Sequence, residues 1–303
     1  MRIAVIGAGL MGHGIALSFA RAGHAVALHD PEPAALASAP ARIAQSLDLL
    51  GAAPEEVALA VAGVTLAGSL AEAVRHAEVV FEAAPEKLPL KQAIFAQVEA
   101  AAPGDAILAS NTSVIQITKI MEGLSGRQRA LGTHWWNPPH MIPLVEVVKT
   151  EWTDPALAEA MVDLLAAVGK TPVMVERDVP GFIGNRLQHA LWREAISLVE
   201  NGICTAKAVD DVVKASFGRR MAVLGPMENA DLVGLELTQD IHAQLFFDLE
   251  SAAAPSPLLQ SLRDAGRSGM AAGAGLRDWE EGDLDATKAR IAAHLRKLEA
   301  ILP

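Results

Sequence analysis

The feature that most constrains this chain is a glycine pattern near its start. Gly7-Ala8-Gly9-Leu10-Met11-Gly12 follows an apolar run at residues 2–6 and precedes a helical pattern. Gly7 permits a tight turn, Gly9 lets the backbone approach a pyrophosphate, and Gly12 lets helix and strand pack closely. The free amides at the start of the helix then bind phosphate. The pattern predicts the first unit of a Rossmann-type sheet that binds a dinucleotide.

An aspartate indicates which dinucleotide is bound. Asp30 follows the second apolar run, at residues 25–29. A carboxylate at that place accepts the ribose hydroxyls of the adenosine and repels the 2′-phosphate of NADP. The next arginine, Arg42, lies twelve positions further on, and we count it as too distant to compensate. We therefore expect NAD. An ordinary strand–helix turn beside a surface aspartate is the alternative interpretation.

The remaining pattern predicts two domains. Residues 1–180 alternate β-type runs with helical patterns, which is typical of a parallel sheet with crossover helices. We expect an α/β, doubly wound Rossmann domain at 1–180 and a smaller all-α domain at 181–303, with 250–282 irregular. The predicted strands are 2–6, 25–29, 78–82, 106–109, 130–136, 143–149 and 172–175, and the predicted helices are 10–22, 34–50, 88–101, 155–168, 182–201, 205–217, 227–249 and 285–301.

Composition excludes several classes of protein. A net charge of -11, from 36 acidic and 25 basic residues, repels nucleic acid. Every apolar stretch is interrupted before a membrane-spanning length is reached, and the first residues lack the pattern of a signal peptide. Cys204 is the only cysteine, so neither an intramolecular disulfide nor a cysteine-rich zinc site can form, and we expect no metal. We expect a cytoplasmic protein.

The chain contains no tyrosine. Dehydrogenases of the short-chain class use a tyrosine as proton donor, so their mechanism is excluded here. Proton transfer has to use histidine, a carboxylate, lysine or water.

Four further motifs carry a resemblance. They are Ser110-Asn111-Thr112-Ser113, Gly132-Thr133-His134-Trp135-Trp136-Asn137-Pro138, Leu144-Val145-Glu146-Val147 and Pro180-Gly181-Phe182-Ile183-Gly184-Asn185-Arg186. In this order they resemble the L-3-hydroxyacyl-CoA dehydrogenase superfamily over nearly the whole chain. The run from His134 to Glu146, with Gly225-Pro226-Met227-Glu228, is most similar to the branch that holds L-gulonate 3-dehydrogenase and lambda-crystallin. The resemblance implies an NAD-dependent oxidation of a hydroxyl group, and a homodimer formed through the helical domain.

The chemistry of these residues fits that implication. An imidazole titrates near neutrality, so His134 suits the base that takes the hydroxyl proton. Glu146, across a proline-rich corner, can hold the imidazole in one tautomer and stabilise its charged form. The resemblance implies that Ser113 and Asn185 bind the substrate oxygen. It also implies substrate contacts from His134 and Asn137, and contacts of Glu86 and Lys91 with the nicotinamide side of the cofactor.

Each residue also has a structural interpretation. Ser113 could cap a helix over 114–121, Asn185 could cap a turn, and Glu146 could be a surface charge at a strand edge. Trp135 and Trp136 are more typical of a core or an interface, and we interpret His140 as structural.

Departures from the family bear on the substrate. A serine and a lysine after the second strand hold coenzyme A in the acyl-CoA enzymes; Ser46 matches the serine, but the lysine position falls near Ala53. The glycine-rich segment 269–275 also lacks the family's lysine. We therefore expect a small free L-3-hydroxy acid, its carboxylate met by Arg186 or Lys149.

Three other functions compete with this one. The main alternative is a short-chain 3-hydroxyacyl-CoA dehydrogenase, in which basic groups such as Arg219 and Arg220 would meet coenzyme A. A non-catalytic, crystallin-like NAD-binding protein is more remote. The 3-hydroxyisobutyrate and 6-phosphogluconate dehydrogenases are excluded, because they need a lysine four residues before the asparagine and Gly181 stands there.

Overall fold

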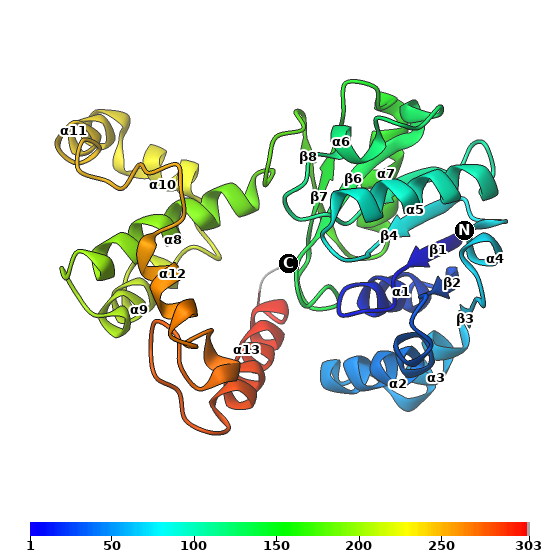
Figure 1. Ribbon diagram of the computed structural model, residues 1–303, viewed down its shortest axis with the longest axis horizontal. Coiled ribbons are helices and arrows are strands. Elements are labelled where there is room, and N and C mark those ends of the chain that lie inside the picture. Colours follow the sequence, from blue (N-terminus) through cyan, green and yellow to red (C-terminus); the bar gives the residue numbers. More distant parts are fainter. Residues whose placement is uncertain (302–303) are drawn as a thin grey trace. The chain divides into compact units, whose positions relative to one another are not determined.

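In the computed structural model, which describes residues 1–301, the apolar runs form one eight-stranded sheet (Figure 1). Its spatial order is β3-β2-β1-β4-β5-β6-β7-β8. Strands β1 to β6 are parallel, β7 is antiparallel to β6, and β8 is parallel to β7. The strands are β1 (Arg2–Ile6), β2 (Ala25–His29), β3 (Val64–Leu66), β4 (Val79–Glu82), β5 (Ile107–Ser110), β6 (Ala130–Trp135), β7 (Leu144–Val148) and β8 (Thr171–Val175).

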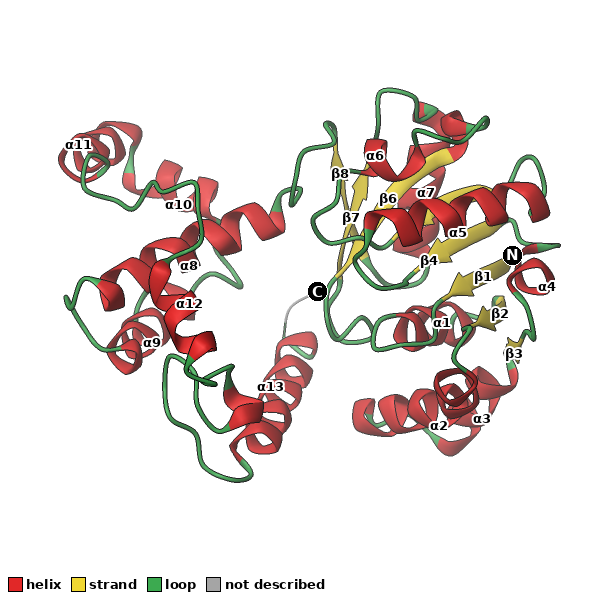
Figure 2. Ribbon diagram, viewed as in Figure 1, coloured by secondary structure: helices red, strands yellow, loops and turns green. Residues whose placement is uncertain are grey.

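Seven helices accompany the sheet (Figure 2). Proline stands in the first turn of α2, α3, α5 and α7, where its missing N–H costs no hydrogen bond. Gly51 ends α2 in the left-handed conformation. The helices are α1 (Gly12–Arg21), α2 (Pro33–Leu50), α3 (Pro54–Ala62), α4 (Leu70–Val74), α5 (Leu88–Ala101), α6 (Ile117–Met121) and α7 (Pro155–Ala167).

Both faces of the sheet are buried, because successive side chains of a strand point to opposite faces. In β1, Ile3 and Val5 join an apolar cluster with α1, α2, α3 and α7, whereas Ala4 and Ile6 join a second cluster with α4, α5 and α6. This layered core makes Met1–Arg186 one compact unit.

The chain from Leu187 onward forms a second compact unit. Gly275 is the only buried residue among those whose burial is described in this part of the chain. Its helices are α8 (Gly184–Glu200, which begins in the first unit), α9 (Ala206–Ala215), α10 (Pro226–Val233), α11 (Leu235–Leu245), α12 (Pro257–Asp264) and α13 (Asp283–Glu299). No helix in residues 1–301 is long and apolar enough to cross a membrane.

The α/β class with a helical second part is confirmed, and some element assignments were wrong. The single helix expected at 227–249 is two, because Gly234 adopts a positive φ of 95° between α10 and α11. The stretch 250–282, expected to be irregular, contains α12, whose N-terminus is capped by Ser256. The sequence pattern missed α3, β3 and α4, which are short.

Candidate active site

The carboxyl ends of β1, β4, β5 and β6 lie at one edge of the sheet, and β7 begins there because it runs the opposite way. The strand order reverses between β1 and β4, which is where ligands bind in open α/β sheets.

The glycine loop after β1 has the geometry of a phosphate cradle. A Cβ atom on Gly12 would lie 1.7 Å from the carbonyl oxygen of Gly7, and one on Gly7 would meet the oxygen of Ala83 at 2.7 Å. These two positions therefore accept only glycine without a rearrangement. A Cβ atom on Gly9 would have no neighbouring atom within 4 Å, so open space remains where a pyrophosphate would approach.

Asp30 and Arg42 both contact this loop. One carboxylate oxygen of Asp30 accepts the amide of Ala8 at 2.6 Å. The Arg42 guanidinium, from α2, donates to the carbonyl oxygens of Ala8 and of Gly9 (3.2 Å). The sequence-based view that Arg42 lies too far away is wrong, because α2 folds back along the loop. A lack of nearby arginine therefore cannot be the reason for a preference for NAD over NADP.

His134 and Glu146 face each other directly in the antiparallel register of β6 and β7. The distance from His134 Nδ1 to Glu146 Oε2 is 2.7 Å, and the two residues are 4 % and 1 % exposed. An ionised carboxylate can only accept hydrogen bonds, so Nδ1 carries a proton, and in the neutral imidazole Nε2 then has the lone pair. This arrangement leaves Nε2 able to accept a proton from a hydroxyl group.

Glu146 stays ionised through its surroundings. Its second oxygen accepts the amides of Ile183 at 2.8 Å and Gly184 at 3.0 Å. Burial opposes ionisation, but the hydrogen bonds from His134 and from these two amides outweigh it and hold the pKa of Glu146 below its usual value. The interpretation of Glu146 as a surface charge is wrong.

Ser113 and Asn185 come together at the same edge. The Asn185 amide group donates to the backbone oxygen of Ser113 at 2.8 Å. The Ser113 side chain does not cap α6, which begins only at Ile117; Thr112 instead accepts the amide of Ile115. Asn137 is exposed and precedes a cis bond to Pro138.

Glu86 organises the loop that carries Ser113. Its Oε1 atom accepts the Thr112 hydroxyl and the amides of Ser113 and Val114, both at 3.1 Å. Burial alone would raise its pKa, but these hydrogen bonds and the charge of Lys91 hold the pKa below the usual value.

Lys91 has no exposed surface, and its ammonium contacts Glu82 at 2.7 Å and Glu86 at 3.6 Å. Lys91 therefore lies buried beside Glu86, and its expected contact with the cofactor stays a prediction. Sequence reasoning missed Glu82, which is fully buried and also accepts the Ser110 hydroxyl at 2.6 Å. Its position at the end of β4 was the signal that could have found it.

The aromatic residues next to His134 differ in role. Trp135 is 2 % exposed and lies in the core against Phe19, as the structural interpretation expects. Trp136 turns toward the site, and its ring centroid lies 5.2 Å from that of His134.

His140 is neutral at pH 7, as a structural residue can be. Its burial, and then the charges of His13 and Lys170, lower its pKa to about 4.

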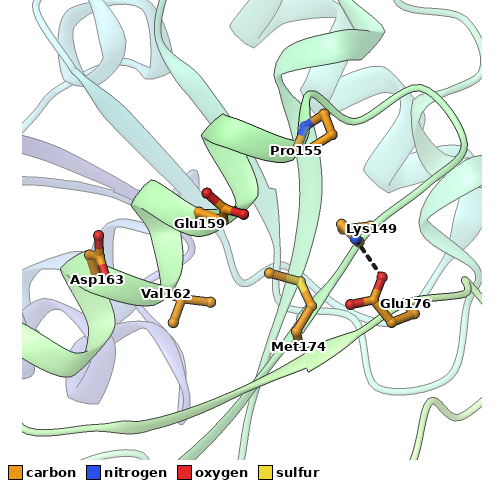
Figure 3. A pocket seen from close by; sticks show the side chains of 7 residues that line it. All are labelled: Lys149, Pro155, Glu159, Val162, Asp163, Met174 and Glu176. Atoms are coloured by element: carbon orange, nitrogen blue, oxygen red, sulfur yellow. Dashed lines mark ion pairs between the residues drawn. The ribbon is translucent and has the colours of Figure 1, made fainter.

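Lys149, one of the two cations expected to meet the substrate carboxylate, lies away from this edge of the sheet, and Ser46 is buried. Lys149 follows the far end of β7 and pairs with Glu176 at 2.5 Å beside a hollow below α7 (Figure 3). Ser46, which matches the serine that holds coenzyme A, is only 6 % exposed. Arg186 remains at the site's edge, next to Asn185 in the first turn of α8.

Comparisons with known proteins agree with this arrangement. The family model for the 3-hydroxyacyl-CoA dehydrogenase NAD-binding domain matches residues 2–179, and that for the C-terminal domain matches 181–279. The 5-formyl-3-hydroxy-2-methylpyridine 4-carboxylate 5-dehydrogenase of Mesorhizobium japonicum is 36% identical over 99% of this chain and 96% of its own. A crystal structure of an enzyme so named, described as an NAD+-dependent dismutase, has a TM-score of 0.92 at 35% identity and covers 99% of this chain and 98% of its own. The L-carnitine dehydrogenase of Streptomyces griseus is 39% identical over 78% of this chain and 70% of its own.

Proposed function

Since this chain belongs to the 3-hydroxyacyl-CoA dehydrogenase family and is an NAD-dependent dehydrogenase acting on CH–OH groups, we propose that it oxidises the β-hydroxyl of a small free L-3-hydroxy acid to the 3-keto acid. The hydrogen bond between His134 and Glu146 supports the reaction. The burial of Ser46 is the observation that carries the choice of a free acid.

His134 takes the hydroxyl proton on Nε2 while the carbon-bound hydrogen leaves as hydride. NAD, when bound at the glycine loop, supplies the hydride acceptor. Glu146 fixes the imidazole tautomer and stabilises the imidazolium that forms. Ser113 and Asn185, which are hydrogen-bonded to each other, steady the charge that develops on the substrate oxygen. Arg186, adjacent to Asn185, is the cation closest in sequence to these groups and meets the substrate carboxylate.

Coenzyme A carries several phosphate charges, which proteins normally meet with lysine or arginine. On α2 and α3 the only basic residue is Arg42, which is bonded to the glycine loop. The first turn of α3 carries Glu55 and Glu56, and the nearby Arg21 is already paired with Glu56 at 2.6 Å. The names of the pyridine carboxylate and L-carnitine enzymes likewise contain no thioester. L-gulonate belongs to the same chemical class of free acids.

The test compares kcat/KM for L-gulonate, L-carnitine and 3-hydroxybutyrate with that for 3-hydroxybutyryl-CoA under one set of conditions. We expect a free acid to be preferred. A thioester preference of about a hundredfold, equivalent to about 2.7 kcal/mol, would overturn the choice and favour a short-chain 3-hydroxyacyl-CoA dehydrogenase. If the protein turns over none of these hydroxy compounds, the result would favour a crystallin-like, non-catalytic protein.

We also propose that the protein is a cytoplasmic homodimer. The second unit exposes many large apolar side chains, and a surface of that kind marks a protein interface. They include Leu191 and Trp192 on α8, Leu235 and Ile241 on α11, and Phe246 and Phe247 after it.

A further inference from the structure

The turn that leads into α8 has an unusual backbone. Phe182 has a φ of 51°, the only positive φ at a non-glycine position in the described residues, and it follows Gly181 at 74°. Phe182 is also 1 % exposed. A bulky residue stays in the left-handed region only where its surroundings hold it there.

This turn makes several contacts with the pair of His134 and Glu146. The ring of Phe182 lies 5.6 Å from the imidazole, at 53° to it. Trp136 lies 5.2 Å from the same imidazole, also at 53°. The next two amides after Phe182, those of Ile183 and Gly184, donate to Glu146.

Gly184 completes the arrangement. A Cβ atom there would lie 2.4 Å from Cζ2 of Trp136, so the absence of a side chain lets the indole lie against the turn. Two aromatic rings therefore contact the imidazole, and two backbone amides donate to the carboxylate. Residues 181–184 and Trp136 provide all of these contacts.

We propose that Phe182 is a positioning residue for the dehydrogenation: its left-handed backbone directs its own ring onto His134 and the following two amides onto Glu146. The inference rests on the proposed function, in which His134 is the base. An extended backbone at Phe182 would turn both amides away from the carboxylate. The imidazole would then lose one ring contact and the charge support of a fixed carboxylate, and small misplacements of a catalytic group are costly in rate.

A purely structural role is the competing explanation, because Phe182 belongs to an apolar cluster of the core. Phe95 is a matched control, since it is fully buried in the same cluster but lies on α5 and contacts neither His134 nor Glu146 in any ring or hydrogen-bond contact described. Losing either ring should lower the melting temperature. Only the loss at Phe182 should change the chemistry.

The experiment compares Phe182→Leu, Phe182→Val and Phe95→Leu in the full-length protein. Leucine tolerates the left-handed backbone about as well as phenylalanine but lacks the ring, whereas the β-branched valine disfavours that backbone. We expect Phe182→Leu to lower kcat by about tenfold or more, with KM for NAD and for the hydroxy acid within about threefold. Phe95→Leu should leave kcat near the wild-type value.

Phe182→Val should also reduce the part of the acid dependence of stability that comes from Glu146, measured as the free energy of unfolding between pH 3 and 7. Glu146 then loses two hydrogen bonds that favour its ionised form, so its pKa rises and the carboxylate is lost at a higher pH. His134 is the only titratable side chain described in contact with Glu146. Neither leucine variant should change the pH dependence of the free energy of unfolding in this way.

The inference is overturned if Phe182→Leu and Phe95→Leu lose stability equally and both keep wild-type kcat. Should Phe182→Val fail to fold, the comparison of the two leucine variants still decides. His134→Gln is measured alongside. If that variant keeps full turnover, the proposed function has failed, whereas a dead His134→Gln with a normal Phe182→Leu contradicts only the role of Phe182.

Discussion

The two units of this chain bury their side chains very differently. In Met1–Arg186 the two faces of the sheet are covered by separate apolar clusters, and residues such as Phe81, Phe19 and Phe95 have no exposed surface. From Leu187 onward, where burial is described, only Gly275 is buried, and Phe247 is 83 % exposed. The first unit thus contains a complete hydrophobic core, while the helices of the second present apolar surface.

The difference in burial suits the two units to different roles: the first to holding the site rigidly, the second to association. A site that must hold His134 and Glu146 to within a few tenths of an ångström needs a close-packed scaffold, and the sheet supplies it. Helices whose apolar residues are not covered within their own unit are suited to association. The following predictions test that division, from the largest expected effect to the smallest.

His134→Gln should reduce kcat by about 10²–10⁴-fold, because the base is lost. The affinity for NAD should stay close to that of the wild type, since the glycine loop is unchanged. Steady-state kinetics and calorimetric titration with NAD measure the two quantities. Near-normal turnover at neutral pH would show that the base lies elsewhere, and would remove the main functional reason for the rigid first unit.

Truncation of an aromatic ring should have opposite consequences in the two units. Phe81→Ala, in the core beside Phe19 and Trp135, should lower the free energy of unfolding by about 3–5 kcal/mol. Phe247→Ala should change it by less than about 0.5 kcal/mol in a dilute, monomeric sample.

The Phe247→Ala variant also tests the proposed homodimer. Phe247→Ala should weaken association, so its melting temperature should depend on protein concentration less than that of the wild type does. Analytical ultracentrifugation and thermal melts at several concentrations measure both properties. A wild-type protein that is monomeric at every concentration contradicts the dimer.

Acid should destabilise the first unit in part through Glu146. Its pKa is lowered in the folded state, so its stabilising contribution is complete above the usual glutamate value of 4.5 and is lost as the pH falls through the lower folded pKa. Glu146→Gln should remove this part of the pH dependence, which denaturant titrations between pH 3 and 7 would measure. Glu78→Gln, at an exposed ion pair with Arg2, is the control. Identical pH dependence in wild type and Glu146→Gln would contradict the assignment.

Asp30→Ala should weaken NAD binding by about tenfold, through the lost hydrogen bonds to ribose and to Ala8. The ratio of kcat/KM for NAD to that for NADP should fall, because Arg42 stays beside the loop while the repelling carboxylate is gone. Asp48→Ala, at an exposed position of α2, should leave the ratio unchanged. Equal use of the two cofactors by the wild type would contradict the role of Asp30.

Local sequence patterns were enough to predict most of the strands and helices of the first unit. The strand–glycine–helix pattern at residues 2–12 and the β-type runs at 25–29, 130–136 and 143–149 predicted their elements closely, because burial on both faces demands near-continuous apolar runs. The second unit was harder to predict. There α10 and α11 merged in the prediction, because the break between them depends on the positive φ of Gly234, and α12 was missed.

The sequence by itself predicted the α/β class, the glycine loop and the pairing of His134 with Glu146, since each depends on residues close together in the chain or on a motif with a required chemistry. Tertiary structure decided which side chains face the site. It brought Arg42 to the glycine loop, buried Lys91 beneath Glu86, and placed Lys149 at the far end of β7. It also gave Phe182 its left-handed backbone. Strand register and helix docking involve partners many residues apart, and a change of one position turns a side chain to the opposite face, so no local pattern could settle these placements.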